Sequence, residues 1–167
     1  MKVSGFEAIV GALNDAGVRF IVVGGLAVIA HGYLRVTHDV DVVIKLTPGD
    51  IANAFRALAS IGYLPSVPVT IEQFSDPAQR EEWRTQRNMV VLKMWSERHP
   101  ETPLDIFIHE PFDFDEEYRR AYRPEDPALA AAFVSLPALI AMKESSGREH
   151  DRIDVEKLRQ IADWKES

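Results

Sequence analysis

The sequence contains no cysteine among its 167 residues. This absence excludes disulfide bonds, thiolate metal sites and a cysteine nucleophile, and it fits a reducing compartment. We therefore do not expect this chain to carry out oxidative chemistry.

Long hydrophobic runs are also missing. The most apolar stretch, residues 20–30, is interrupted by Gly24 and Gly25 and is too short to cross a bilayer. It begins too far along the chain to be a signal peptide. We expect a soluble, cytoplasmic protein without a membrane partner.

Positive charge is scarce, with 19 Lys and Arg against 26 Asp and Glu, and a formal net charge of −7. This balance excludes a protein that coats nucleic acid nonspecifically, although it allows a local basic patch. Neither repeats nor low-complexity segments occur. A chain of this length can remove roughly 70% of its unfolded surface from water, so a single domain over 1–167 is expected.

Apolar spacing and turn residues predict alternating helices and strands in the first half of the chain. The predicted elements are a helix through Phe6 and Leu13 that stops at Gly17, a strand over 18–23, a helix over 25–31, a strand over 39–45, and a helix capped by Thr47 that ends at Gly62. In the predicted strand 39–45, Asp39, Asp41, Val43 and Lys45 share one face, which we expect to be polar.

The second half predicts a helix over 76–87, two strands in "NMVVLKMW" and "PLDIFIHE" that form an antiparallel hairpin, and a Pro-rich acidic connection. Two helices follow, one capped by Ser135 and one with an apolar stripe of Ile153, Leu158, Ile161 and Trp164. The fold class is therefore α/β (α+β).

Three aspartates are candidates for metal chemistry. Asp39 and Asp41 project from the same face of their strand, where two carboxylates can share a hard divalent cation. Asp105 lies between apolar neighbours on a predicted strand, and a carboxylate in such a place needs an arginine, a hydrogen-bond network or a metal. The alternative for the Asp39 pair is an ordinary solvated strand edge.

Gly24 and Gly25 stand between a strand and a helix, where the lack of side chains lets an anion such as a triphosphate approach backbone N–H groups. A tight turn that requires glycine is the alternative. His31 is interpreted as a residue at a helix end that binds a carbonyl or stacks. The aromatic side chains that could line a base pocket, or simply belong to the core, are Trp83, Trp95 and Phe107.

The motif "GGLAVIAHGYLRVTHDVDVVI", with a later strand aspartate, resembles the nucleotidyltransferase superfamily related to DNA polymerase β. Together with "AMKESSGREHDRIDVEKL", it is similar to the minimal nucleotidyltransferases of bacterial toxin–antitoxin and abortive-infection (AbiEii-like) systems. The resemblance implies a mixed central sheet flanked by helices. Residues 1–110 would form the catalytic core and 111–167 a helical C-terminal part.

The resemblance also implies roles for the three aspartates and the two glycines. Asp39 and Asp41 would hold Mg²⁺ or Mn²⁺, while Asp105 would complete the metal site and accept the proton of the acceptor hydroxyl. Gly24 and Gly25 would cradle the phosphates of a nucleoside triphosphate (NTP), although many relatives have serine where this chain has Gly25.

Four further residues would contact the triphosphate. Arg35 and Thr37 lie in the loop before the aspartate pair, and Lys143 and Arg148 lie in the late segment, where they could neutralise the leaving pyrophosphate. The alternatives are an exposed loop position for Arg35 and, for the late pair, a solvated basic face paired with Glu144, Glu149 or Asp151.

The predicted function is metal-dependent transfer of a nucleoside monophosphate from an NTP to a hydroxyl of a partner protein or a tRNA, as part of a toxin–antitoxin system. One alternative is a small-molecule acceptor of the aminoglycoside or lincosamide type. Another is a catalytically inactive module that binds a cognate toxin or antitoxin.

Overall fold

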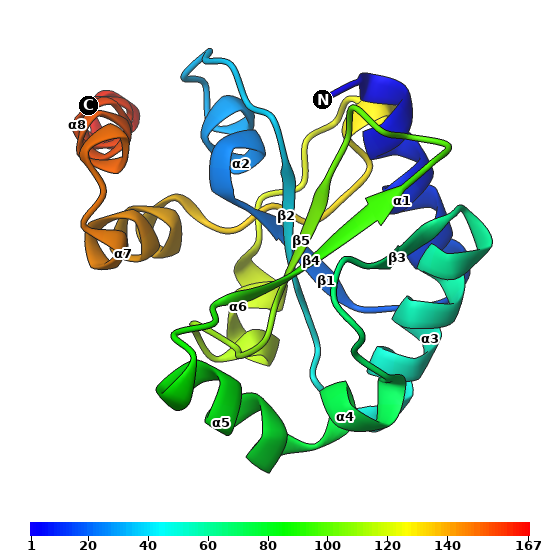
Figure 1. Ribbon diagram of the computed structural model, residues 1–167. Coiled ribbons are helices and arrows are strands. Elements are labelled where there is room, and N and C mark those ends of the chain that lie inside the picture. The colour runs from blue at the N-terminus through cyan, green and yellow to red at the C-terminus, as the bar shows by residue number, and fades with distance from the viewer.

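The computed structural model describes residues 1–167 and contains one five-stranded mixed sheet of order β1-β2-β5-β4-β3 (Figure 1). Strand β2 runs parallel to β5, and the other neighbours are antiparallel. The strands are β1 (Phe20–Val23), β2 (Val40–Ile44), β3 (Tyr63–Pro65), β4 (Val91–Ser96) and β5 (Leu104–Phe107). The mixed sheet and the β4–β5 hairpin confirm the predicted fold class.

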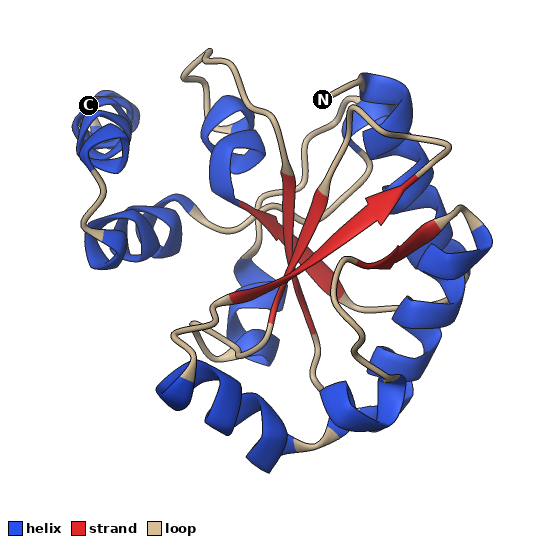
Figure 2. Ribbon diagram, in the orientation of Figure 1, coloured by secondary structure: helices blue, strands red, loops and turns tan.

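Helices flank the sheet, with α1 and α3 on one side and α2 and α7 on the other (Figures 1 and 2). The helices are α1 (Val3–Asp15), α2 (Gly24–Ala30), α3 (Pro48–Ser60), α4 (Ile71–Ser75), α5 (Pro77–Gln86), α6 (Phe114–Arg120), α7 (Leu136–Ser146) and α8 (Glu149–Glu166), with a 3₁₀ turn, η1, at Pro127–Leu129. None of these helices is long and apolar enough to cross a membrane.

The first two long helices follow the sequence signals. Helix α1 buries Phe6 and Leu13 in the core, and the chain leaves it through Gly17, whose φ of 68° is accessible to glycine. Helix α3 begins at Thr47, whose hydroxyl accepts a hydrogen bond from the Asp50 N–H at 3.1 Å. Both predicted helices are therefore confirmed, together with the strand and helix between them.

Two predictions about faces are wrong. Val43 is fully buried, so the face of β2 that carries Asp41 is polar only at the N-terminal end of the strand. The reason is that β2 is an interior strand, with β1 and β5 as its neighbours. On α8, Ile153 and Trp164 are 51% and 78% exposed, because this helix lies at the edge of the molecule and packs mainly on α7 (Figure 1).

Three short elements were not predicted. Strand β3 has three residues, too few for a periodic pattern. Helix α4 has a capping box between Thr70 and Gln73, which is a signal that the sequence does carry. Helix α6 lies in the stretch expected to be an acidic connection. Its acidic residues follow the N-cap Asp113 and stabilise the first turn of the helix.

The core joins the C-terminal segment to the sheet. Val22 of β1 exchanges backbone hydrogen bonds with Ala132 and Val134, at 2.8 and 2.9 Å. Leu139 of α7 and Leu158 of α8 belong to the same cluster of 33 buried apolar residues as the sheet. This packing places α7 and α8 beside the end of β2 that carries the aspartates.

Candidate functional site

Two of the predicted aspartates lie side by side on neighbouring strands. Asp41 of β2 is the register partner of Asp105 of β5 in the parallel pair, so their side chains emerge on the same face of the sheet. Asp39 lies one residue before β2, and its charge raises the pKa of Asp41. The structure thus brings Asp39, Asp41 and Asp105 to one end of the sheet.

The backbone turn at Gly24 lies directly against Asp41. Gly24 has a φ of 69°, and a Cβ at this position would lie 2.2 Å from Oδ2 of Asp41. Both the dihedral angle and the contact require glycine here. The turn therefore leaves the carboxylate beside the start of α2, a helix whose first N–H groups receive no side-chain cap.

Gly25 packs against Thr37 in the same way. A Cβ at Gly25 would lie 2.6 Å from Oγ1 of Thr37 and 3.7 Å from Cζ of Arg35. The loop before β2 thus occupies the space into which a serine at this position would project. A threonine hydroxyl from a different segment therefore lies where a side chain at position 25 would begin.

Crowded carboxylates and burial act together on Asp41. Burial, with the negative charges of Asp105 and Asp39, raises the pKa of Asp41 to about 7, while the nearby ammonium group of Lys143 acts in the opposite direction. Burial also raises the pKa of Asp105, against the effect of Lys93. Removing negative charge from this cluster, by a proton or by a cation, would relieve the repulsion.

The residues have the donor chemistry that a magnesium ion requires. Oδ1 of Asp105 is buried and has no hydrogen-bond partner, with only Lys93 Nζ 3.5 Å away. Carboxylate oxygens are the preferred ligands of Mg²⁺ and Mn²⁺. The three side chains do not form a closed ligand set, since no group of three or more His, Asp or Glu residues is positioned to enclose an ion.

A second cluster of charges lies between α7 and α8, and we call it the α7–α8 ion cluster. Lys143 is nearly buried and its Nζ lies 2.8 Å from Oδ1 of Asp151 and 3.0 Å from Oδ2 of Asp154. Arg148 and Ser146 also donate hydrogen bonds to Asp151. Although burial alone would raise it, these hydrogen bonds lower the pKa of Asp151 to about 2.

Arg35 connects this cluster to the loop before β2. Its Nη1 lies 2.5 Å from Oδ2 of Asp154, and its Nε donates a hydrogen bond to the Val36 carbonyl at 3.2 Å. Arg35 is therefore not the ordinary exposed loop residue that the sequence allowed. Lys143 and Arg148 do form the pairing with Asp151 that the sequence offered as an alternative, but Lys143 is inside the protein rather than on a solvated face.

The structure thus places eight of the nine predicted site residues around one region, where α2, β2, β5 and α7 meet. Arg148 is the least enclosed of the nine, with its side chain 65% exposed. Asp151 and Asp154 were not predicted as site residues. The sequence does carry a signal that could have indicated them. Asp151 and Asp154 are three residues apart on a predicted helix, and they follow the basic residues Lys143 and Arg148.

The remaining candidates have simpler roles. His31 Nε2 lies 2.8 Å from the Val134 carbonyl, and its ring lies 5.2 Å from that of Tyr122, which confirms the interpretation of a helix-end residue. Trp83 belongs to the core. Trp95 is 47% exposed on β4 and is not a core residue.

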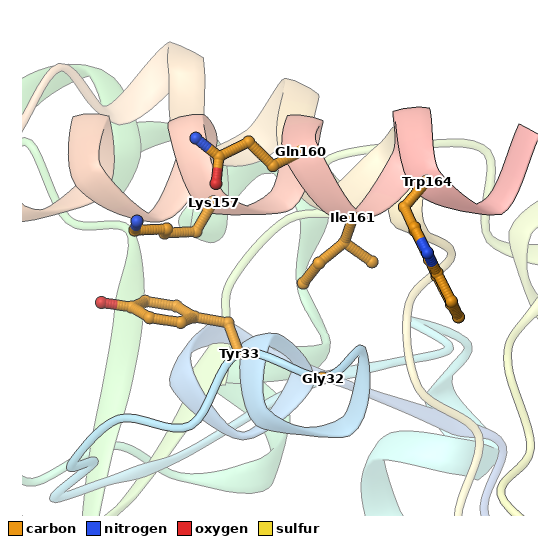
Figure 3. A pocket seen from close by; sticks show the side chains of 6 residues that line it. All are labelled: Gly32, Tyr33, Lys157, Gln160, Ile161 and Trp164. Atoms are coloured by element: carbon orange, nitrogen blue, oxygen red, sulfur yellow. The ribbon is translucent and has the colours of Figure 1, made fainter. Parts of the chain in front are cut away.

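Two hollows lie on the surface, and neither is lined by any of the nine predicted site residues. One, of about 280 Å³, lies between Gly32 and Tyr33 after α2 and four side chains of α8 (Figure 3). The second, of about 700 Å³, lies over β3 and β4 and is lined by Gly62, Leu64, Pro65, Ser66, Trp95, Glu97 and Arg98. The first is next to the α7–α8 ion cluster, and the second is on the strand side, beyond Lys93.

No protein-family model matches this sequence, and no curated protein is significantly similar to it. Solved structures do resemble it. The solution structure of the antibiotic-resistance factor ANT(2'')-Ia superposes with a TM-score of 0.58 at 14% identity, over 95% of this chain and 81% of that one. The crystal structure of ANT(2'')-Ia in complex with adenylyl-2''-tobramycin gives 0.56 at 12% identity, over 93% and 86%. The chain therefore has a nucleotidyltransferase-like fold.

Proposed function

We propose that the protein is a metal-dependent nucleotidyltransferase that moves a nucleoside monophosphate from an NTP to a hydroxyl group and releases pyrophosphate. The observation that carries this proposal is the position of Asp41 beside Asp105, in contact with the turn at Gly24. Carboxylates whose pKa values rise through crowding destabilise a metal-free fold, so a cluster of this kind is expected where a cation binds.

Each group has a role in this reaction. Asp39, Asp41 and Asp105 would hold Mg²⁺ or Mn²⁺, which neutralises the triphosphate and the attacking oxygen. Asp105 would accept the proton of the acceptor hydroxyl as its oxygen bonds to the α-phosphorus. The bond from that phosphorus to the pyrophosphate oxygen breaks, and pyrophosphate leaves.

The triphosphate would lie along the turn at Gly24 and Gly25, where the first N–H groups of α2 receive no side-chain cap. Arg35 and Lys143 would contact its charged oxygens, with Thr37 and Arg148 nearby. A bound triphosphate would share the two cations Arg35 and Lys143 with Asp154, which already contacts both.

A small molecule is the acceptor that the structural neighbours favour, since the ANT(2'')-Ia crystal contains adenylyl-2''-tobramycin. Both of these structures are of the resistance factor ANT(2'')-Ia, so the resemblance to toxin–antitoxin enzymes stays a prediction. We therefore place the small-molecule acceptor ahead of a partner protein or a tRNA.

A labelling experiment tests the reaction. The protein is incubated with Mg²⁺, each α-³²P-labelled NTP in turn, and a bacterial lysate, a tRNA fraction or tobramycin, and the products are separated by gels and thin-layer chromatography. We expect label on an acceptor together with release of pyrophosphate, and a loss of about 10³-fold or more in Asp41→Asn, because that change removes a metal ligand.

The matched control is Asp163→Asn, an exposed aspartate of α8, which should retain full transfer. Transfer that survives Asp41→Asn would exclude the proposed mechanism. Stabilisation of the wild-type protein by Mg²⁺ and a non-hydrolysable NTP analogue is the independent sign of a working nucleotide site.

A further inference from the structure

The open side of the sheet continues from the aspartates onto β4 and β3. Along β4, Leu92, Met94 and Ser96 are buried, and Ser96 Oγ donates a hydrogen bond to the carbonyl of Ile61 at the end of α3. The alternate residues Lys93 and Trp95 therefore point to the opposite face.

This face is the one that carries Asp105. Lys93 is the register partner of Asp105, and Lys93 Nζ lies 3.5 Å from Oδ1 of Asp105. Trp95 follows two residues later on the same face, which makes it a diagonal neighbour of Asp105. Diagonal neighbours in an antiparallel pair are roughly 7–8 Å apart, within reach of one ligand.

The surface beyond Lys93 has the shape and composition of a ligand site. The hollow of about 700 Å³ lies here, with the apolar side chains of Leu64 and Trp95 as register partners on its floor. Leu64 is 60% exposed and Trp95 47%. An exposed indole beside a hollow of this size is typical of a site where a ring of the ligand stacks on the indole.

The charges on this face select the kind of ring. Two cations border this face. Lys93 Nζ lies 3.5 Å from Asp105 Oδ1 with its side chain 69% exposed, and Arg98 Nη1 donates a hydrogen bond to the carbonyl of Ser60 at 2.9 Å. Glu97 lines the hollow and takes part in no ion pair. A polyanion such as RNA would meet the carboxylate of Glu97 in this hollow, whereas an ammonium group would find a carboxylate and an indole face.

We propose that Trp95, Leu64 and Glu97 form the acceptor subsite, and that it takes a small hydroxylated ring carrying ammonium groups, an amino sugar. The apolar face of the ring stacks on Trp95, an ammonium group pairs with Glu97, and a hydroxyl reaches Asp105. This inference rests on the proposed function, because Asp105 is there the group that accepts the hydroxyl proton.

The competing location is the hollow of about 280 Å³ in Figure 3, where Tyr33 lies beneath Lys157 and Trp164 lies on the far side of Ile161. It lies at the C-terminal end of α2, whereas Gly24 and Gly25 lie at the other end. At about 1.5 Å per residue, the seven residues of α2 separate the two ends by about 10 Å. Trp164 is therefore the matched control for Trp95.

Isothermal titration calorimetry tests the subsite. The full-length protein, saturated with Mg²⁺ and a non-hydrolysable ATP analogue, is titrated with tobramycin, with the neutral trisaccharide maltotriose, and with tRNA. We expect tobramycin to bind in preference to the other two. Its Kd should rise about tenfold in Trp95→Leu and a few-fold in Glu97→Gln, and it should stay within twofold in Trp164→Leu.

Each other outcome overturns the subsite. Equal tobramycin binding by wild type and Trp95→Leu, a loss in Trp164→Leu instead, equal binding of maltotriose, or binding of tRNA in place of tobramycin would contradict it. An unchanged melting temperature of Trp95→Leu shows that the variant is folded. Failure of the Mg²⁺ and analogue to stabilise the wild type rejects the proposed function, whereas stabilisation without Trp95-dependent tobramycin binding rejects only the subsite.

Discussion

The carboxylates at the end of β2 and those at the start of α8 have opposite electrostatic surroundings. Asp41 faces Asp105 and Asp39, and its pKa rises to about 7. Asp151 faces Lys143, Ser146 and Arg148, and its pKa falls to about 2 although it is fully buried.

The comparison separates function from folding. Charges that stabilise a fold are paired and hydrogen-bonded, as in the α7–α8 ion cluster, where removing one partner leaves an uncompensated buried charge. Charges that destabilise the free protein, as at Asp41, are typical of a site that awaits a ligand. Arg35 belongs to both regions, since it pairs with Asp154 and lies beside Gly25.

The largest loss of stability is expected from breaking the α7–α8 ion cluster. Asp151→Asn should lower the free energy of unfolding by about 3 kcal/mol, because Lys143 keeps its charge inside the protein without its closest partner. For a chain of this size the melting temperature would fall by roughly 6–12 °C. Chemical unfolding at pH 7 measures the effect, and the exposed Asp163→Asn should change it by less than about 0.5 kcal/mol. Equal stability of the two variants would show that the cluster does not hold α7 to α8.

An effect of opposite sign is expected at Asp41. Folding raises the pKa of this carboxyl from 3.8 to about 7, so the unfolded state ionises first and the folded state loses stability as the pH rises through this window. Asp41→Asn removes that loss. Without metal, the variant should be more stable than wild type at pH 8, by up to about 4 kcal/mol, and equally stable near pH 4.

Thermal unfolding in a chelating buffer at the two pH values makes this measurement. Asp15→Asn, at an exposed position at the end of α1, should follow the wild type at both. A stability difference for Asp41→Asn that does not change with pH would contradict the assigned titration.

The smallest effect is expected where the two regions meet. Arg35→Lys keeps the charge but loses the guanidinium that binds Asp154 and the Val36 carbonyl at the same time. We expect the KM for the NTP to rise about tenfold with kcat within threefold, because the loss concerns substrate binding rather than the reacting atoms. Arg152→Lys on the exposed face of α8 is the control. A fall in kcat with unchanged KM would place Arg35 at the reacting phosphorus instead.

Much of the frame was predictable because it depends on local signals. The caps of α3 and α7, the apolar spacing of α1 and the burial of β1 are each encoded within a few residues. Strand β3 and helix α4 were missed because three and five residues are too few for periodicity. The polar face expected along β2 was wrong at Val43 because burial depends on the neighbouring strands.

The sequence by itself determined which groups are available: two glycines at a strand end, three aspartates on predicted strands, and basic residues late in the chain. The tertiary structure alone decided their pairing. The parallel register of β2 and β5 places Asp41 beside Asp105. The packing of α7 on α8 places the ammonium group of Lys143 against Asp151 and Asp154 inside the protein rather than in solvent. The physical reason is that pKa values, ion pairs and open faces depend on distances between segments far apart in the chain, which no local pattern of residues contains.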